Sequence, residues 1–256
     1  MNTNSKIALI TGASSGIGKA TANIFAEHAY DLFLIARRAE RLDELKSELE
    51  LKHKIKVHIL ALDLRDRGAL ENAWKQVPDA WKKIDVLVNN AGLSLGLEPF
   101  FDGNIDDWEN MIDTNIKSLL YVSKIVANEM IKYSKGHIIN IGSIAGKESY
   151  PNGNVYCSTK AAVDSLTKSM RMDLVTKGIK VSAVHPGAVE TEFSVVRFKG
   201  DQERADNVYK GFEPLIAQDI ADVIYFMASR PAHVNVQDVL VMPTAQASAT
   251  IINKVL

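Results

Sequence analysis

The stretch T-G-A-S-S-G-I-G, Thr11 to Gly18, decides the expected fold because it follows the apolar run 7–10 and opens a helical pattern. Its glycines let the backbone approach a pyrophosphate, aim amides at it from a helix N-terminus, and bring helix close to strand. The spacing differs from G-x-G-x-x-G, and the ending of a Walker phosphate loop is missing. A plain strand-to-helix turn is the alternative. The candidate cofactor contacts are Gly12, Ser14, Ser15, Gly16, Ile17 and Gly18.

Apolar runs and helical patterns alternate along the chain. Runs typical of buried parallel strands lie at 7–11, 31–36, 56–62, 86–89, 137–142, 180–184 and 236–241. Helical spacing lies at 18–28, 40–51, 66–82, 106–133, 155–176 and 217–228. We expect Pro78 to bend or end the third helix. The alternation predicts one α/β domain of Rossmann type over residues 1–256, with a seven-stranded parallel sheet and helices on both faces.

The segment 186–211 lacks a clear period and precedes the last expected helix. It carries the cations Arg197, Lys199 and Arg204. We interpret it as a substrate lid.

Composition narrows the class of partner. The chain has 30 basic and 31 acidic side chains, which gives a formal net charge of −1. It therefore lacks the excess positive charge that would attract nucleic acid or an anionic membrane. No apolar stretch approaches the ~20 residues of a membrane span. The single Cys157 excludes an internal disulfide, and the residues 1–6 are too polar for a signal peptide. We expect a cytoplasmic protein that acts on small metabolites.

Tyr156 and Lys160, in Y-C-S-T-K, lie four residues apart. On a helix this spacing places the phenol and the ammonium on one face. A nearby cation favours the phenolate, so the pair is suited to proton transfer. An ordinary helix surface is the alternative.

Three further polar blocks follow expected strands. They are Asn89-Asn90-Ala91-Gly92, Ser143, and Pro186-Gly187. Open parallel α/β sheets bind their ligands at the carboxyl ends of the strands, where these blocks meet the glycine stretch. A serine hydrolase is excluded because Ser143 lacks a G-x-S-x-G elbow. The six histidines lack metal-ligand spacing, so we expect no metal; His185 is the one expected to line the site.

With these motifs the chain resembles the short-chain dehydrogenase/reductase family over nearly its whole length. The resemblance implies that Tyr156 is the acid/base and that Ser143 polarises a substrate carbonyl. It implies that Lys160 lowers the pKa of the phenol and holds the nicotinamide ribose. It also implies that Asn115 kinks its helix and holds a water linked to Lys160; a mid-helix Asn that caps a break is the alternative.

Arg37 and Arg38 follow the second strand, where an acidic residue would bind the ribose diol of NAD. Two guanidinium groups instead favour the 2′-phosphate of NADP(H). Alternatively, these arginines and Arg41 form a solvated helix start that pairs with Glu40, Asp43 and Glu44.

The resemblance implies further cofactor contacts, each with a structural alternative. Asp63 matches the carboxylate that binds the adenine amino group, but it could cap a helix. Thr191 matches the residue that bonds the nicotinamide carboxamide, but it could cap the lid; Asn90 and Gly92 could be structural. The remaining positions implied by the resemblance are Leu64, Pro186, Gly187 and Val189.

Several stretches are similar to the NADP-dependent 3-hydroxy acid dehydrogenase branch, also called serine 3-dehydrogenase; the most telling is F-S-V-V-R-F-K-G-D, at 193–201. Such enzymes act on serine, allo-threonine or 3-hydroxy acids, and reduce 3-oxo acids such as malonic semialdehyde. A carboxylate substrate needs a cation, for which Arg197 or Lys199 is the candidate and Lys147 a lesser one. Arg197 could instead anchor the lid or touch the cofactor.

Two other functions remain open at this point. One is a broad-specificity carbonyl or 3-oxoacyl reductase of the same family; the other is a non-catalytic nucleotide-binding scaffold. The family resemblance also implies a homotetramer built on helices 106–133 and 155–176, helped by the apolar tail 245–256.

Overall fold

The computed structural model describes residues 5–255, so the polar start and the apolar tail lie partly outside the described residues. A seven-stranded sheet has the order β3-β2-β1-β4-β5-β6-β9, and every neighbouring pair is parallel. The expected fold class is confirmed. The strands are β1 Ile7–Thr11, β2 Asp31–Ala36, β3 Val57–Ala61, β4 Val86–Asn89, β5 Gly136–Ile141, β6 Ile179–Pro186 and β9 Asp238–Val241.

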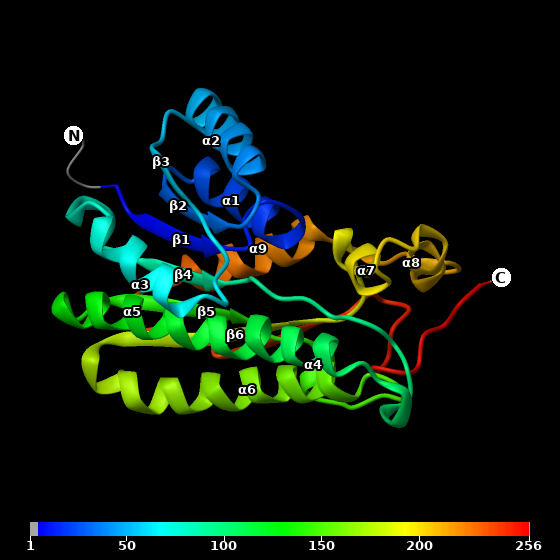
Figure 1. Cartoon of the computed structure of the whole chain (residues 1–256). Helices are drawn as coiled ribbons and strands as arrows, with labels where there is room; N and C mark the ends of the chain where they lie inside the picture. Colours follow the sequence, from blue (N-terminus) through cyan, green and yellow to red (C-terminus); the bar gives the residue numbers. More distant parts are fainter. Residues whose placement is uncertain (1–4, 256) are drawn as a thin grey trace.

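Helices cover both faces of the sheet (Figure 1). On one face α1, α2 and α9 pack over side chains such as Ile10 and Leu34; on the other, α3, α5 and α6 pack over side chains such as Leu9 and Phe33. Burying one such side chain stabilises the fold by about 1.5–3 kcal/mol. The helices are α1 Gly16–Glu27, α2 Ala39–His53, α3 Arg67–Gln76, α5 Ser118–Lys132, α6 Asn154–Leu174 and α9 Ala217–Ala228.

Two expected helices are interrupted. The helix expected at 66–82 ends at Gln76, and a short 3-10 turn, Asp79–Trp81, follows Pro78, which lacks the N–H a helix needs. The helix expected at 106–133 is α4 Ile105–Ile112, a π-helical turn Asp113–Lys117, and α5. Asn115 lies in that turn, which interrupts the helix where the family resemblance implies a kink.

The segment 186–211 is more regular than its sequence suggested. It contains β7 Val189–Glu190, α7 Glu192–Arg197 and α8 Gln202–Tyr209. The two helices are capped by the side chains of Thr191 and Asp201, and β7 pairs with β8 Leu215–Ile216. Both helices lie to one side of the sheet, beside the loops that follow its strands (Figure 1). Helices of six and eight residues are too short for a period to be read.

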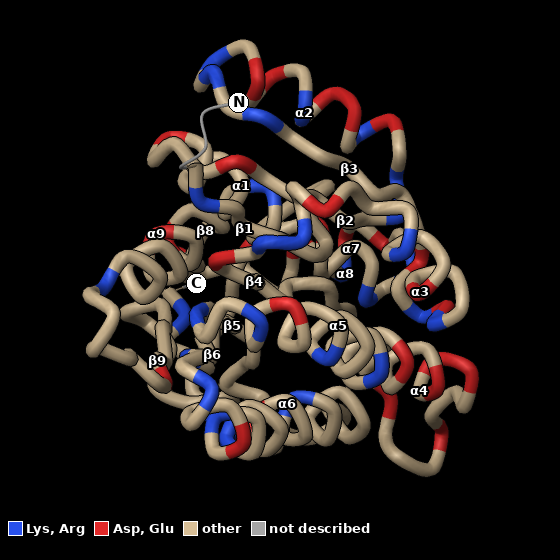
Figure 2. Tube along the Cα trace, turned by 90° about the vertical axis from the view of Figure 1, so that its left-hand side faces the viewer, with Lys and Arg blue, Asp and Glu red and all other residues tan. Residues whose placement is uncertain are grey.

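Charges of both signs are interspersed on the molecule. Figure 2 shows Lys or Arg alternating with Asp or Glu along α2, whereas acidic residues dominate the start of α4. Across residues 5–255, each helix is either too short or too polar to cross a membrane.

Candidate active site

A cleft of about 590 Å³ lies at the carboxyl ends of β1, β2, β4, β5 and β6. The carboxyl ends of parallel strands therefore gather the motif residues, as the sequence predicted. Gly18 and Asn115 do not line the cleft and lie behind its wall. The predicted residues that line it are Gly12, Ser14, Ser15, Gly16, Ile17, Arg37, Arg38, Asp63, Leu64, Asn90, Ser143, Tyr156, Lys160, Pro186, Gly187, Val189, Thr191 and Arg197.

The glycine loop is shaped for close backbone approach. Gly12 has φ +65°, and a Cβ there would lie 2.9 Å from Asn90 Nδ2. A Cβ on Gly18 would overlap the carbonyl oxygen of Gly12, so Gly18 allows α1 to pack against the loop. The backbone of Gly16, at φ +50°, begins α1 with its amides toward the cleft edge. This arrangement fits a dinucleotide pyrophosphate, because a helix N-terminus and open glycines favour an anion.

Asn90 holds the loop in place from the neighbouring strand. Its Nδ2 donates to the carbonyl oxygens of Thr11, at 2.9 Å, and Gly12, at 3.2 Å. The Thr11 hydroxyl accepts from the backbone amides of Asn90 and Ala91. The structural role foreseen for Asn90 is therefore present, and Thr11 shares it.

Arg38 joins the glycine loop to α7. Its Nη2 donates to Ser15 Oγ at 2.7 Å and to Ser14 Oγ at 3.1 Å, and its Nη1 lies 2.9 Å from Glu192 Oε2. Arg41 Nη1 lies 2.7 Å from Glu192 Oε1. The hydrogen bond from Arg38, helped by Arg41, holds the pKa of Glu192 below its ordinary value although burial opposes this. The alternative in which Arg38 and Arg41 pair with their own helix is wrong.

Asp63 lines the cleft two residues after the end of β3. Its carboxylate accepts from Arg65 Nε, and the Arg65 hydrogen bond lowers the Asp63 pKa. The side chain that caps α3 is Asp66, which accepts from the backbone amide of Ala69 at 2.9 Å. The cap alternative for Asp63 is therefore wrong.

Tyr156 and Lys160 lie on the first turns of α6, inside the cleft. Burial raises the pKa of Tyr156 above its ordinary value, Tyr150 adds to this, and the Ser143 hydrogen bond and Arg197 oppose it. Lys160 Nζ donates to Ile141 O at 2.9 Å and lies 6.0 Å from the Tyr156 ring centroid; burial lowers its pKa to about 8. Burial is therefore the largest influence on the phenol in this geometry, and the expected effect of Lys160 on its pKa stays a prediction.

Ser143 and Asn115 complete this part of the site. Ser143 Oγ accepts from the Ala145 amide at 3.1 Å. Asn115 is buried, and its side chain both accepts from Leu93 N and donates to Leu93 O, each at 2.8 Å. Its Nδ2 also donates to Thr159 Oγ1 at 3.0 Å. Asn115 thus fixes the loop after β4 to α6 through the π-helical turn, a feature frequent at functional sites.

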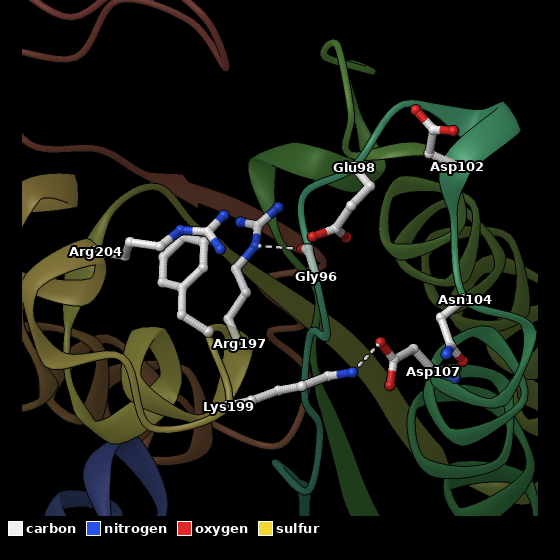
Figure 3. A pocket seen from close by; sticks show the side chains of 9 residues that line it. Gly96, Glu98, Asp102, Asn104, Asp107, Arg197, Lys199 and Arg204 are labelled. Carbon is white, nitrogen blue, oxygen red and sulfur yellow. Dashed lines mark hydrogen bonds and ion pairs between the residues drawn. The ribbon is translucent and has the colours of Figure 1, made fainter.

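Of the three cations considered for a substrate carboxylate, Arg197 is the one that lines this cleft. Its Nε donates to Gly96 O at 3.1 Å and its Nη2 to Tyr150 Oη at 3.2 Å, and its guanidinium carbon lies 5.9 Å from the Tyr156 ring centroid. Lys199 instead reaches Asp107 across a smaller cavity of about 200 Å³ (Figure 3). Arg197 therefore anchors the segment 186–211, which was the alternative to a substrate role, and it also faces the phenol ring of Tyr156.

Lys147 is bound elsewhere, in a group of charges behind β5 and β6. Its Nζ lies 2.8 Å from both Asp164 Oδ1 and Asp238 Oδ2. His185 Nε2 lies 3.2 Å from Asp238 Oδ2, and its ring is fully buried outside the cleft lining, so the expectation for His185 is wrong. The ligand atoms of Asp164, His185 and Asp238 lie within 4.8 Å of one another, but the ammonium groups of Lys147 and Lys168 already pair with the two carboxylates.

Comparison with known proteins follows this geometry. A family described as short chain dehydrogenase matches residues 6–202. The chain belongs to the short-chain dehydrogenase family. An NADP-dependent 3-hydroxy acid dehydrogenase of Schizosaccharomyces pombe is 46% identical over 95% of both chains. A sulfoacetaldehyde reductase 2 of Chromohalobacter salexigens is 45% identical over 95% of this chain and 96% of its own. A closed form of serine dehydrogenase complexed with NADP+ superposes with a TM-score of 0.91, at 41% identity over 96% of this chain and 98% of its own.

The cleft of this short-chain dehydrogenase also contains polar residues that the sequence did not predict, among them Tyr150, Glu192 and Gln246. Tyr150 binds Arg197, Glu192 binds two arginines, and Gln246 Oε1 accepts from Ala188 N at 2.8 Å. None belongs to a strand-end motif of the quoted kind. The tail residue Gln246 reaches the cleft only through the folding of residues 58 positions away, which no local pattern reports.

Proposed function

We propose that the protein is an NADP(H)-dependent oxidoreductase that transfers a hydride between the cofactor and the C3 hydroxyl or carbonyl of a small 3-hydroxy acid. The substrates would be of the serine, allo-threonine, 3-hydroxypropionate or malonic semialdehyde type. The observation that carries the proposal is the placement of Arg197 beside the Tyr156 ring, 5.9 Å from its centroid. A cation that faces the proton donor selects a substrate with an anionic group near its reacting carbon.

The cofactor would lie along the cleft from the arginines to the phenol. Gly12, Gly16 and the start of α1 fit its pyrophosphate. Arg37 and Arg38 fit a 2′-phosphate, because guanidinium groups bind phosphate by charge-assisted hydrogen bonds. Thr191 and Lys160 fit the nicotinamide end. Relatives and solved neighbours whose names include NADP support this choice over NAD.

Bound NADPH supplies the hydride. In the reducing direction Tyr156 gives its proton to the alkoxide that develops on the substrate oxygen, and burial keeps the phenol protonated until then. Ser143 donates a hydrogen bond to the same oxygen, where negative charge develops. The Lys160 ammonium stands behind the phenol, and Asn115 holds the loop at 93 that borders it. The oxidising direction requires Tyr156 to release its own proton first, after which the phenolate accepts the proton of the alcohol.

The substrate carboxylate would bind at Nη1 of Arg197. Among the described residues, Arg197 uses Nε and Nη2 in hydrogen bonds, which leaves Nη1 for a ligand. The relatives support an anionic substrate: one is named for 3-hydroxy acids and another for sulfoacetaldehyde, whose sulfonate carries the same charge. The segment 186–211, which presents Arg197, would act as the lid.

A substrate panel tests the proposal. NADPH oxidation and NADP+ reduction are measured with malonic semialdehyde, sulfoacetaldehyde, L-serine, 3-hydroxypropionate and a 3-oxoacyl thioester, each with the NAD counterpart at matched concentration. We expect turnover of the small acids with NADP(H), and weak turnover with NAD(H) or the thioester. Faster turnover of the thioester would favour the broad-specificity reductase, and turnover of none would favour the scaffold.

We further propose a cytoplasmic homotetramer. Large apolar side chains are exposed on α5 and at the end of α6, where the chain itself does not cover them: Leu120, Tyr133, Met172 and Val175. Such side chains favour association with another copy. Sedimentation equilibrium should give four times the mass of the chain, and the mass of a monomer would contradict the proposal.

A further inference from the structure

Glu192, the first residue of α7, joins two arginines that lie more than 150 positions earlier in the chain. Its Oε2 lies 2.9 Å from Arg38 Nη1 and its Oε1 lies 2.7 Å from Arg41 Nη1. Each carboxylate oxygen therefore serves one guanidinium. The residue belongs to no motif in the sequence, and the catalytic steps above make no use of it.

Arg38 presents a different edge to each neighbour. Its Nη1 serves Glu192, while Nε and Nη2 face the Ser14 and Ser15 hydroxyls at 2.7–3.2 Å. A guanidinium is planar and carries its donors in a fixed fork, so one group can bind two anions on two edges. A phosphate that enters on the serine side would meet the Nε–Nη2 edge without breaking the pair with Glu192.

The charges also balance at this end of the cleft. Arg37, Arg38 and Arg41 carry three positive charges, and Glu192 removes one of them. The two that remain match a phosphate monoester, which carries about −1.5 to −2 at pH 7. Without Glu192 the arginines would repel one another more strongly and lose the partner that fixes Arg38 and Arg41 together.

The same carboxylate ties the start of α7 to the glycine loop. The preceding Thr191 caps α7 with its hydroxyl, and its side chain lies 3.4 Å from the position of a Cβ on Gly16. The six residues of α7 end at Arg197, which binds Gly96. One short helix therefore runs from the arginines at the cofactor end of the cleft to the cation beside Tyr156.

We propose that Glu192 is a positioning residue for the cofactor: it holds Arg38 and Arg41 for the 2′-phosphate of NADP(H), and α7 is therefore fixed more firmly over the cleft when that phosphate binds. The inference rests on the proposed use of NADP(H). It adds that the 2′-phosphate is sensed by the segment that carries Arg197, so NADPH and NADH would leave α7 in different states.

The first test is direct cofactor binding to Glu192→Gln, followed by the fluorescence of bound NADPH and NADH. We expect the Kd of NADPH to rise about 5-fold, because Arg38 and Arg41 lose the exposed ion pairs, of about 0.2–1 kcal/mol each, that orient them before the phosphate binds, and the Kd of NADH to change less than about 2-fold. Glu190→Gln, which removes an exposed carboxylate two residues earlier, is the matched control and should leave both values unchanged. Equal weakening of both cofactors, no change, or tighter NADPH binding would overturn the proposal.

The second test is hydrogen exchange of residues 192–197 at saturating NADPH or NADH. In the wild type, exchange should be slower with NADPH, and in Glu192→Gln this difference should vanish while both cofactors remain saturating. A wild type that protects α7 equally with both cofactors would overturn the coupling. Absence of binding by either cofactor would instead contradict the proposed function, so the two failures are distinguishable.

Discussion

The glycine loop and the segment 186–211 face each other across one cleft, but they are held in different ways. The loop lies between fully buried strands, and its glycines are required because a Cβ would meet backbone atoms. The segment is fixed to its surroundings by side chains, chiefly Glu192, Arg197 and Lys199, two of which are exposed. Backbone constraints produce a recognisable sequence motif, whereas side-chain contacts between distant residues do not. In the proposed function, the loop holds the cofactor that supplies the hydride, and the segment 186–211 selects the substrate.

The largest effect should follow a change at the phenol, which breaks the chemistry without touching either region. Tyr156→Phe removes the proton donor, and general acid catalysis contributes about 10²–10⁴-fold, so kcat should fall by that factor. The Kd of NADPH should change less than about 2-fold. Tyr133→Phe, at an exposed tyrosine on the far end of α5, is the control and should leave kcat unchanged. Turnover by Tyr156→Phe at the wild-type rate would remove Tyr156 from the mechanism.

A smaller effect should follow a change at the cofactor end of the loop. Arg37→Asp with Arg38→Ala removes two phosphate ligands and adds a carboxylate that suits a ribose diol. Charge-assisted hydrogen bonds contribute about 1.5–3 kcal/mol, so kcat/KM with NADPH should fall at least about 10-fold and NADH should become the preferred cofactor. Steady-state kinetics with both cofactors measure this. If NADPH remained preferred, these arginines would be surface charge only.

A further prediction concerns stability and isolates the buried ammonium. Burial lowers the Lys160 pKa to about 8, from an ordinary 10.5, so between these values the folded chain binds fewer protons than the unfolded chain. Stability from this group therefore rises with pH from about 8 to 10.5, and below pH 8 the buried charge costs up to about 3 kcal/mol. Lys160→Met should lose this pH dependence and be more stable at pH 7.

Denaturant unfolding at pH 7, 8, 9 and 10 checks this prediction. The difference in unfolding free energy between Lys160→Met and the wild type should shrink as pH rises. Lys75→Met, at an exposed lysine on α3, should show a constant difference. A constant difference for Lys160→Met as well would mean that burial does not lower the pKa of Lys160.

The sequence predicted the cleft residues at the strand ends better than those that come from other parts of the chain. Strand-end motifs identified the sheet and residues of the cleft lining such as Gly12, Gly16 and Asn90, because glycine and asparagine are needed there by backbone geometry. His185 was misplaced because alternate side chains of a strand point to opposite faces, and its ring faces Asp238 while Pro186 and Gly187 reach the edge. Tyr150, Glu192 and Gln246 were missed because tertiary folding alone brings them to the cleft.

Element bounds failed where local order is short or irregular. The π-helical turn at 113–117 keeps the apolar spacing of an ordinary helix over 106–133, so the break could be inferred from Asn115 only through the family resemblance. The helices α7 and α8 have six and eight residues, of which two and five are exposed. Their stability comes from caps and from contacts across the cleft, which periodicity does not report.

The central claim is that the segment 186–211 selects an anionic substrate through Arg197. The most direct measurement is the ratio of kcat/KM, with NADPH, for malonic semialdehyde against its neutral methyl ester. The wild type should favour the acid by about 10- to 100-fold, and Arg197→Ala should bring the ratio to within about 3-fold of unity. Arg204→Ala, on the same segment but stacked on Phe198, should keep the wild-type ratio. A wild type that treats acid and ester alike, or an Arg197→Ala variant that keeps the preference, would contradict the account.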